Sequence, residues 1–198
     1  MMRFLTLFSV LILTPLSALG QETLNTAEMT DWTIVVSEEA IPSERYAADE
    51  FQSLFREATG IELPQSTAAA KTPRSVFIGP GETMETSDVG FSTDDLGEEG
   101  LRIRIAPNAI AIAGGRPRGT LYGVYEFMER YLGVRFLTHD HTYIPDKKSW
   151  KLPCETHTYT PPFSFRWSYY KENADYPEFA ARLRVNTTTR DEKLGGIT

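Results

Sequence analysis

The stretch LRIRIAPNAIAIAGGRPRGTLYGVYEFMERYLGVRFL, residues 101–137, decides the fold of this protein. In residues 101–105, apolar side chains alternate with arginines, which is the pattern of a strand with one buried face. Pro107-Asn108 favours a turn, and the apolar residues 109–113 then return as the partner strand. The sequence therefore predicts an antiparallel hairpin at this point of the chain.

A glycine-rich turn and an amphipathic helix follow the hairpin. Residues 114–119, GGRPRG, allow a tight turn, and residues 120–132 carry apolar side chains at helical spacing up to Gly133. The outer glycines of the turn have the spacing of a phosphate-binding loop, but Thr120 stands where that motif needs lysine. We favour a tight structural turn over a phosphate site.

A second amphipathic helix and further strands lie on either side of this stretch. The helix begins at Pro42-Ser43, with Ser43 as the expected N-cap, and ends at Gly60. Strands are predicted over residues 32–37, 61–63, 76–79 and 134–137. The predicted fold class is α+β, a mixed or antiparallel sheet with the two amphipathic helices packed on one face.

Residues 1–20 have the organisation of a secretory signal peptide. A basic start is followed by the apolar run 4–13 and by small residues before Gln21. The run is shorter than the ~20 apolar residues that span a membrane. We expect cleavage before Gln21, a secreted or periplasmic protein, and no membrane association after cleavage.

The composition excludes several classes of protein. The chain has 198 residues and is 41% hydrophobic, which is too apolar for a disordered chain. Lys and Arg together number 20 against 27 Asp and Glu, a net charge of −7, so we expect no nucleic-acid partner. A complete β/α barrel needs roughly 250 residues and does not fit.

Metal and nucleophile chemistry receives little support from the residue pattern. His139-Asp140-His141 and His157 could offer metal ligands, but the spacings of known zinc motifs are absent. The acidic set within residues 94–99 is interpreted as a solvated turn. No base pattern accompanies Cys154, the single cysteine. We therefore expect no metal and no cofactor.

Five segments carry a resemblance to a known family: 47–51 (AADEF), 59–64 (TGIELP), 76–79 (VFIG), 114–127 (GGRPRGTLYGVYEF) and 131–137 (YLGVRFL). They resemble the N-terminal, non-catalytic α+β domain of bacterial exported glycoside hydrolases of the α-glucuronidase and β-N-acetylhexosaminidase type. The subgroup that carries a large, poorly characterised domain downstream is the most similar.

The resemblance implies a division of the chain. Residues 21–138 would form a domain like the second domain of hexosaminidases, and residues 139–162 a Pro-rich junction of mostly loop. Residues 163–198 would be the incomplete start of a β/α barrel, with a strand over 163–167 and a helix over 177–184. We expect this chain to be the front of a larger protein.

The resemblance also implies one candidate substrate contact. In hexosaminidases the arginine of the first barrel strand hydrogen-bonds sugar hydroxyls, which assigns Arg166 to substrate binding, with Trp167 beside it to stack on a sugar. The Gly and the Asp…Arg that follow this strand in hexosaminidases are absent here. No catalytic residue is assigned, because no spacing argument selects a pair among Glu172, Asp175 and Glu178.

These inferences predict the N-terminal accessory portion of an exported glycoside hydrolase-like protein that takes part in polysaccharide degradation and is inactive alone. Its partner would be a carbohydrate, bound through a downstream catalytic domain. The alternative is a non-enzymatic carbohydrate-binding or scaffold module that uses Trp167 and surface tyrosines. A metallohydrolase is a third hypothesis.

Overall fold

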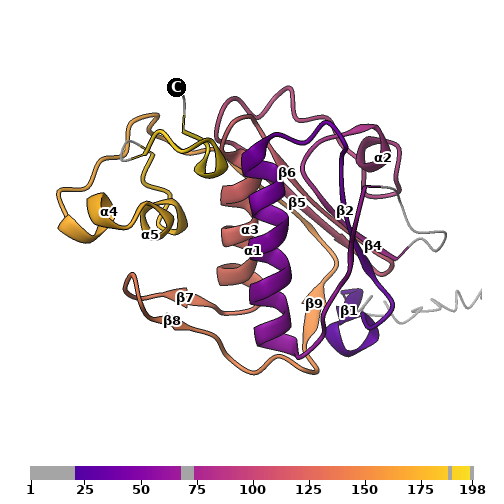
Figure 1. Ribbon diagram of the computed structural model, residues 1–198. Coiled ribbons are helices and arrows are strands. Elements are labelled where there is room, and N and C mark those ends of the chain that lie inside the picture. The colour runs from indigo at the N-terminus through magenta and orange to yellow at the C-terminus, as the bar shows by residue number, and fades with distance from the viewer. Residues whose placement is uncertain (1–20, 68–73, 187–188, 197–198) are drawn as a thin grey trace, which may run out of the picture.

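The computed structural model describes residues 21–67, 74–186 and 189–196 (Figure 1). The predicted signal peptide lies outside the described residues. The main sheet has the strand order β10-β5-β6-β4-β2-β3. Its strands span, in that order, Thr156–Tyr159, Leu101–Ala106, Ala109–Gly114, Ser75–Ile78, Thr33–Val36 and Gln65–Ser66.

The sheet is mixed, as the sequence predicts. β2 pairs in parallel with β3 and β4, and β4 pairs in parallel with β6. β5 runs antiparallel to β6 in the predicted hairpin, with Ile103 opposite Ile112. β4 is central and buried along its length because both faces of the sheet are covered there.

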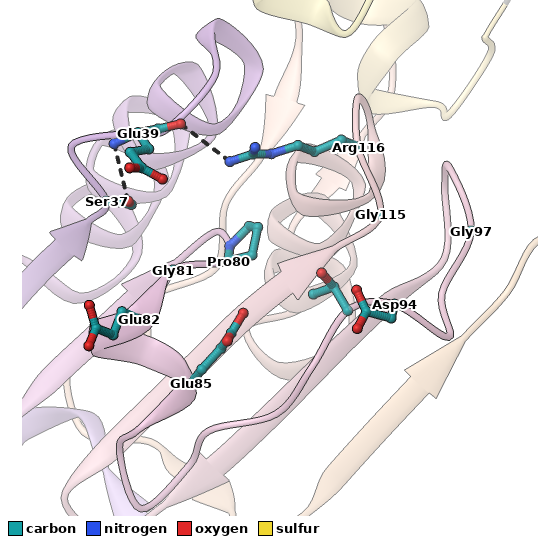
Figure 2. A pocket seen from close by; sticks show the side chains of 11 residues that line it. Ser37, Glu39, Pro80, Gly81, Glu82, Glu85, Asp94, Gly97, Gly115 and Arg116 are labelled. Atoms are coloured by element: carbon teal, nitrogen blue, oxygen red, sulfur yellow. Dashed lines mark hydrogen bonds between the residues drawn. The ribbon is translucent and has the colours of Figure 1, made fainter.

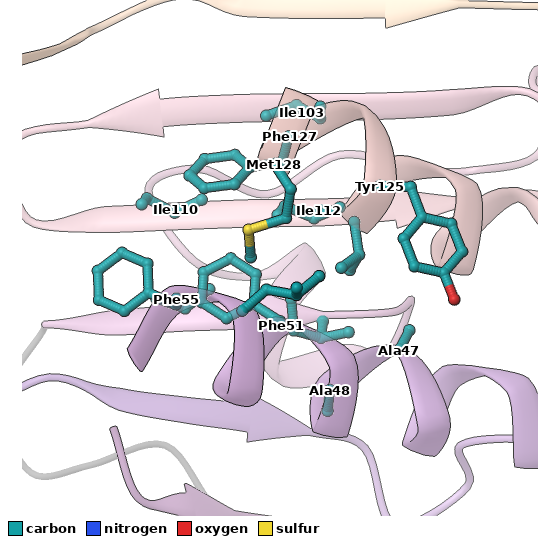
Figure 3. Close-up of a cluster of buried hydrophobic side chains, with 14 of the residues drawn as sticks. Ala47, Ala48, Phe51, Phe55, Ile103, Ile110, Ile112, Tyr125, Phe127 and Met128 are labelled. Carbon is teal, nitrogen blue, oxygen red and sulfur yellow. The ribbon is translucent and has the colours of Figure 1, made fainter. Parts of the chain in front are cut away.

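Two helices cover one face of the sheet, which confirms the predicted α+β arrangement (Figure 1). They are α1, Pro42–Thr59, and α3, Gly119–Tyr131. Figure 3 shows Phe51 and Phe55 of α1 facing Phe127 of α3 over the isoleucines of β5 and β6. The Phe51 ring lies 5.4 Å from the Phe55 ring and 5.4 Å from the Phe127 ring, between centroids.

The opposite face of the sheet has a smaller apolar cluster. Val35, Phe77 and Ala111 pack there against Met84 of α2, Glu82–Glu85, and against Val89 in the following loop. The alanines of β6 point to this side, where short side chains let the covering loop approach the strand. Residues 80–99 therefore form a cover over this face of the sheet, with α2 as the helix within it.

The start of α1 differs from the prediction. Ile41 is the N-cap, and Pro42 is the first helical residue, where its fixed φ suits a helix. The carboxylate of Glu44 accepts a hydrogen bond from the Ile41 N–H at 3.0 Å. Ser43 is not the N-cap: its hydroxyl donates to the carbonyl of Pro117 at 2.6 Å and ties α1 to the glycine-rich turn. At the other end Gly60 has a φ of 77°, the expected left-handed terminus.

Two predicted strands are displaced. The strand expected over residues 61–63 is β3 at Gln65–Ser66, beyond Pro64, whose carbonyl accepts from the Ile34 N–H. The strand expected over 134–137 is β7, Arg135–Phe136, which pairs with β8, Thr142–Tyr143, in a separate ribbon. A proline cannot donate to a ladder, which accounts for the first shift.

Residues 139–162 are mostly loop, as expected, but they also contain three short strands. Besides β8 they include β9, Lys151–Pro153, which pairs with β1, Thr23–Asn25, and β10, which pairs with β5 at the sheet edge. β10 is polar and exposed and lacks an apolar alternation, so no local pattern marks it. The sheet thus continues past the predicted boundary at residue 138, and the division into domains stays a prediction.

The last described part holds short helices. They are α4, Lys171–Asp175, and α5, Pro177–Arg182. The predicted helix from Pro177 is therefore confirmed, but it ends at Arg182 instead of residue 184. The 3-10 turns η1 and η2 span Thr26–Glu28 and Glu192–Leu194. Among the described helices, none is long and apolar enough to cross a membrane.

Candidate functional site

Arg166 lies in a segment that is not a strand, so the strand predicted over residues 163–167 is wrong. The backbone N–H of Arg166 donates to the side-chain oxygen of Asn186 at 3.0 Å, rather than to a neighbouring strand. Residues 160–170 contain no helix or strand. The alternation that suggests a strand is present, but no strand pairs with it among the described residues.

The side chain of Arg166 is turned toward the protein. Its Nη2 lies 2.6 Å from the carboxylate of Glu99, and its Nε and Nη1 donate to the carbonyls of Arg184 and Phe163 at 2.8 and 2.7 Å. The guanidinium also lies 5.8 Å from the centre of the Tyr122 ring. The predicted substrate contact of Arg166 stays a prediction, and in this structure its guanidinium organises the chain around it.

Glu99 is the centre of this arrangement. It is only 8% exposed and accepts from Arg118 at 3.3 Å and from the Asn186 amide at 2.8 Å, in addition to its contact with Arg166. A buried carboxylate needs such partners, because its desolvation is costly. The acidic composition of residues 94–99 predicts a solvated turn for Glu99, whereas the structure buries it. No local signal distinguishes it from Glu98, since its partners come from distant parts of the chain.

Tyr122 of α3 closes the inner side of the same cluster. Burial raises the pKa of Tyr122 to about 12, and the charge of Glu99 adds to the effect, while Arg118 and Arg166 oppose it. The phenol therefore stays neutral throughout the physiological range. It offers a packing surface beneath the guanidinium of Arg166 and has no role as a base.

Trp167 belongs to an exposed aromatic run. Phe163, Phe165, Trp167 and Tyr169 are 71%, 68%, 50% and 97% exposed. The Trp167 ring lies 6.3 Å from that of Phe165 and 6.0 Å from that of Tyr169. These two contacts place the rings of Phe165, Trp167 and Tyr169 next to one another on the surface. A shallow pocket of about 280 Å³ lies beneath Phe163, between Glu98, Arg118 and Asn186.

A larger pocket, of about 520 Å³, lies where the parallel strands β2, β4 and β6 end. Figure 2 shows Arg116 on one side and Glu82, Glu85 and Asp94 around the floor. The carboxylate of Glu44, which is buried, receives Arg116 at 2.8 and 3.1 Å. Crevices at the carboxyl ends of parallel strands are common ligand sites. The surplus of carboxylates here opposes a phosphate or other anion.

The glycine-rich turn beside this pocket is required by packing. A Cβ on Gly115 would lie 1.2 Å from the carbonyl oxygen of Gly97. The N–H of Gly115 donates to the carbonyl of Gly100 at 2.9 Å, so the backbone of the turn is bound to the chain ahead of β5. These contacts agree with the preferred interpretation of residues 114–119 as a tight structural turn.

The candidate metal ligands lie in different contacts. The His139 ring stacks on Tyr176 with centroids 3.7 Å apart, and His157 on β10 lies 3.3 Å from the carboxylate of Glu126. Asp140 accepts from Thr138 at 2.6 Å. Within the described ranges no group of three or more His, Cys, Asp or Glu side chains is arranged to hold a metal ion.

Two of the acids in α4 and α5, Asp175 and Glu178, are paired with lysines. Glu178 lies 3.0 Å from Lys193, and the backbone hydrogen bond at the start of α5 and this lysine lower its pKa. Asp175 pairs with Lys171 at 3.2 Å. Burial raises the pKa of the Cys154 thiol, which disfavours the thiolate that a nucleophile requires.

The comparisons with solved structures identify the fold. A mutant Streptomyces plicatus beta-hexosaminidase in complex with its product GlcNAc is 20% identical, with a TM-score of 0.50 over 84% of this chain and 31% of that one. A GH20 beta-N-acetylhexosaminidase from Streptomyces coelicolor A3(2) is 17% identical, with a TM-score of 0.51 over the same shares, 84% and 31%. At these identities the likeness shows the fold alone.

A family GH115 4-O-methyl-alpha-glucuronidase with specificity for decorated arabinogalactans has the same fold, at 15% identity and a TM-score of 0.59. The match covers 83% of this chain and 28% of that enzyme, so the chain spans about a third or less of the solved structures it matches. The family model of glycosyl hydrolase family 20, domain 2, matches residues 17–128, which is more than half of the sequence. The chain therefore belongs to the glycosyl hydrolase family 20, domain 2 family.

Proposed function

We propose that this chain is the N-terminal accessory portion of an exported glycoside hydrolase-like protein that degrades polysaccharides, and that it does not hydrolyse glycosides by itself. The observation that carries the proposal is the family match over residues 17–128, which is to a domain that accompanies a catalytic one. The carbohydrate would be bound by a catalytic domain downstream. The α+β domain would support that domain from the side.

The environment of the buried acids supports inactivity of the isolated chain. A glycosidase needs one acid that can release a proton and a second carboxylate across the bond. Glu99 is held between Arg118 and Arg166, and Glu50 accepts a two-pronged contact from Arg182. Both carboxylates are therefore engaged as counter-ions to arginines rather than facing an open cleft as a pair.

The test uses residues 21–198 and aryl glycosides, namely the β-N-acetylglucosaminide and the α-glucuronide of p-nitrophenol. We expect no release of p-nitrophenol above that of a Glu99→Gln variant. Hydrolysis that a single substitution within the chain abolishes would overturn the proposal. Export is tested separately by sequencing the N-terminus of the protein recovered outside the cytoplasm, which is expected to begin at Gln21.

The exposed aromatic run favours a second candidate, a non-enzymatic carbohydrate-binding module. The neighbouring exposed rings of Phe165, Trp167 and Tyr169 could stack on successive sugars. Affinity electrophoresis through gels containing soluble polysaccharides measures this directly. Retardation that Trp167→Ala abolishes would support the second candidate, and Trp150→Ala, at a ring 43% exposed elsewhere, is the matched control.

A further inference from the structure

The segment of residues 163–186, hereafter the strap, lies beside the helix pair of the main domain (Figure 1). It contains α4 and α5 and contacts α3 through α5. Its charges are segregated from those of the domain: the strap contributes Arg166, Arg182 and Arg184 to the contact. The domain contributes the carboxylates of Glu50, Glu99, Glu126 and Glu129.

Each strap arginine is held by its own carboxylate site. Arg182 forms a two-pronged contact with Glu50 of α1, with both N–O distances 3.0 Å. Arg184 joins two carboxylates of α3, at 3.2 Å from Glu126 and 2.5 Å from Glu129. Arg166 lies 2.6 Å from Glu99. These pairs connect the strap to α1, α3 and the turn ahead of β5, so they fix its position in three places.

The backbone conformation of Arg184 indicates that the ion pairs determine how the strap lies on the domain. Arg184 has a φ of 58°, in the left-handed region that favours glycine. Among the described residues other than glycine, it alone has a positive φ. This conformation follows α5 and directs the side chain to Glu126 and Glu129. A strained backbone persists only where its surroundings compensate for it, and here the two carboxylates do so.

The apolar part of the contact is small. Phe179, Ala180 and Ala181 are the buried apolar residues of the strap, and two of them are alanines. The large rings at Phe163, Phe165 and Tyr169 are mostly exposed and bury little surface against the domain. A segment with few buried apolar contacts belongs to the parts of a protein that open before the core.

We propose that the strap is a conformational device: it docks on the acidic face of α1 and α3 through these arginines and opens as a unit while the sheet stays folded. Docking places Arg166 on Glu99 and displays the aromatic run outward. Opening uncovers four carboxylates and releases Arg166. The docked state thereby fixes how the chain leaves the α+β domain.

Hydrogen exchange of the whole chain tests the proposal. The Leu183 and Val185 amides donate within the strap, to the carbonyls of Phe179 and Ala180, and report on its opening. We expect them to exchange at least about tenfold faster than the amides of β4 and β6. In Glu50→Arg, repulsion of Arg182 should bring the strap amides to within about tenfold of an unstructured chain, while the sheet amides keep about a thousandfold protection.

Two further variants make the result specific. Glu57→Arg introduces the same charge change on an exposed position of α1 and should leave the strap protected. The exchanged pair Glu50→Arg with Arg182→Glu should restore most of the lost protection. Equal exchange of strap and sheet amides, protection that survives Glu50→Arg, or an exchanged pair that fails to restore it would each overturn the proposal.

Discussion

The sheet-and-helix domain and the strap both contain large aromatic side chains, but they place them in opposite environments. Phe51, Phe55 and Phe127 are fully buried between α1, α3 and the sheet, whereas Phe163 and Phe165 are about 70% exposed. The domain is held by buried apolar surface and the strap by arginine–carboxylate pairs. Apolar burial is undirected and tolerates exchange of similar residues, but ion pairs require particular partners.

The largest expected effect is in the apolar core. Phe51→Ala should lower the free energy of unfolding by about 3–5 kcal/mol, because it removes a fully buried ring that touches two others. Phe163→Ala, at an exposed ring of the strap, should change it by less than about 0.5 kcal/mol. Urea unfolding measures both. Similar losses in the two variants would contradict the contrast between the regions.

The next largest effect is expected at Glu99, the buried carboxylate that joins the domain to the strap. Glu99→Gln leaves Arg118 and Arg166 without their common anion and should cost about 2–4 kcal/mol. Glu98→Gln, at the exposed neighbour, should lie within about 0.5 kcal/mol of the parent chain. Urea unfolding of the matched pair separates the buried charge from the loss of a negative charge as such. Equal stabilities would show that Glu99 is not a structural anion.

A third prediction concerns alkaline pH. Burial raises the pKa of Tyr122 to about 12 in the folded protein, above the ordinary value of about 10 for tyrosine, so the unfolded chain loses the phenol proton first as the pH rises. Its contribution to stability is complete below pH 10 and is lost as the pH approaches 12, by roughly 2 kcal/mol. Tyr122→Phe should therefore flatten the decline of stability between pH 10 and 12. An unchanged slope would argue against this assignment.

The smallest expected effect separates backbone strain from charge at Arg184. Arg184→Ala and Arg184→Gly both remove the contacts with Glu126 and Glu129, but only glycine relieves the positive φ. The glycine variant should be more stable than the alanine variant by about 1 kcal/mol. Thermal unfolding of the two proteins compares them. An alanine variant that is as stable as the glycine variant would contradict the claim that the backbone at Arg184 is strained.

Much of the domain follows from local patterns. The hairpin of β5 and β6, both long helices and the central β4 have apolar periodicity that depends on neighbouring residues alone. No local pattern marks β9, which is only three residues long, or β10, which is polar, and both gain their ladders from strands far along the chain, β1 and β5. The prediction of a strand over residues 163–167 is wrong for a related reason. The alternation of apolar and polar residues is clear, but no described strand pairs with this segment.

The candidate site is harder to predict than the fold. A resemblance selects Arg166, and the general suitability of aromatic rings for sugar stacking selects Trp167. The structure turns Arg166 inward and leaves Trp167 on the surface. Glu99, which organises the cluster, was missed because the acidic set around it has the composition of a solvated turn. Its burial depends on Arg118 and Arg166 arriving from other elements, and no spacing rule describes such a meeting.

The sequence by itself determined the apolar stripes of α1 and α3, the hairpin and the tight glycine turn, because these depend on interactions between residues close in the chain. The tertiary structure alone decided which polar residues are buried and which aromatic rings remain in water. Those outcomes depend on what distant segments place beside each side chain. In this protein, Arg166, Arg182 and Arg184 pair with glutamates of the domain that no local pattern distinguishes. These pairs hold the strap on the domain.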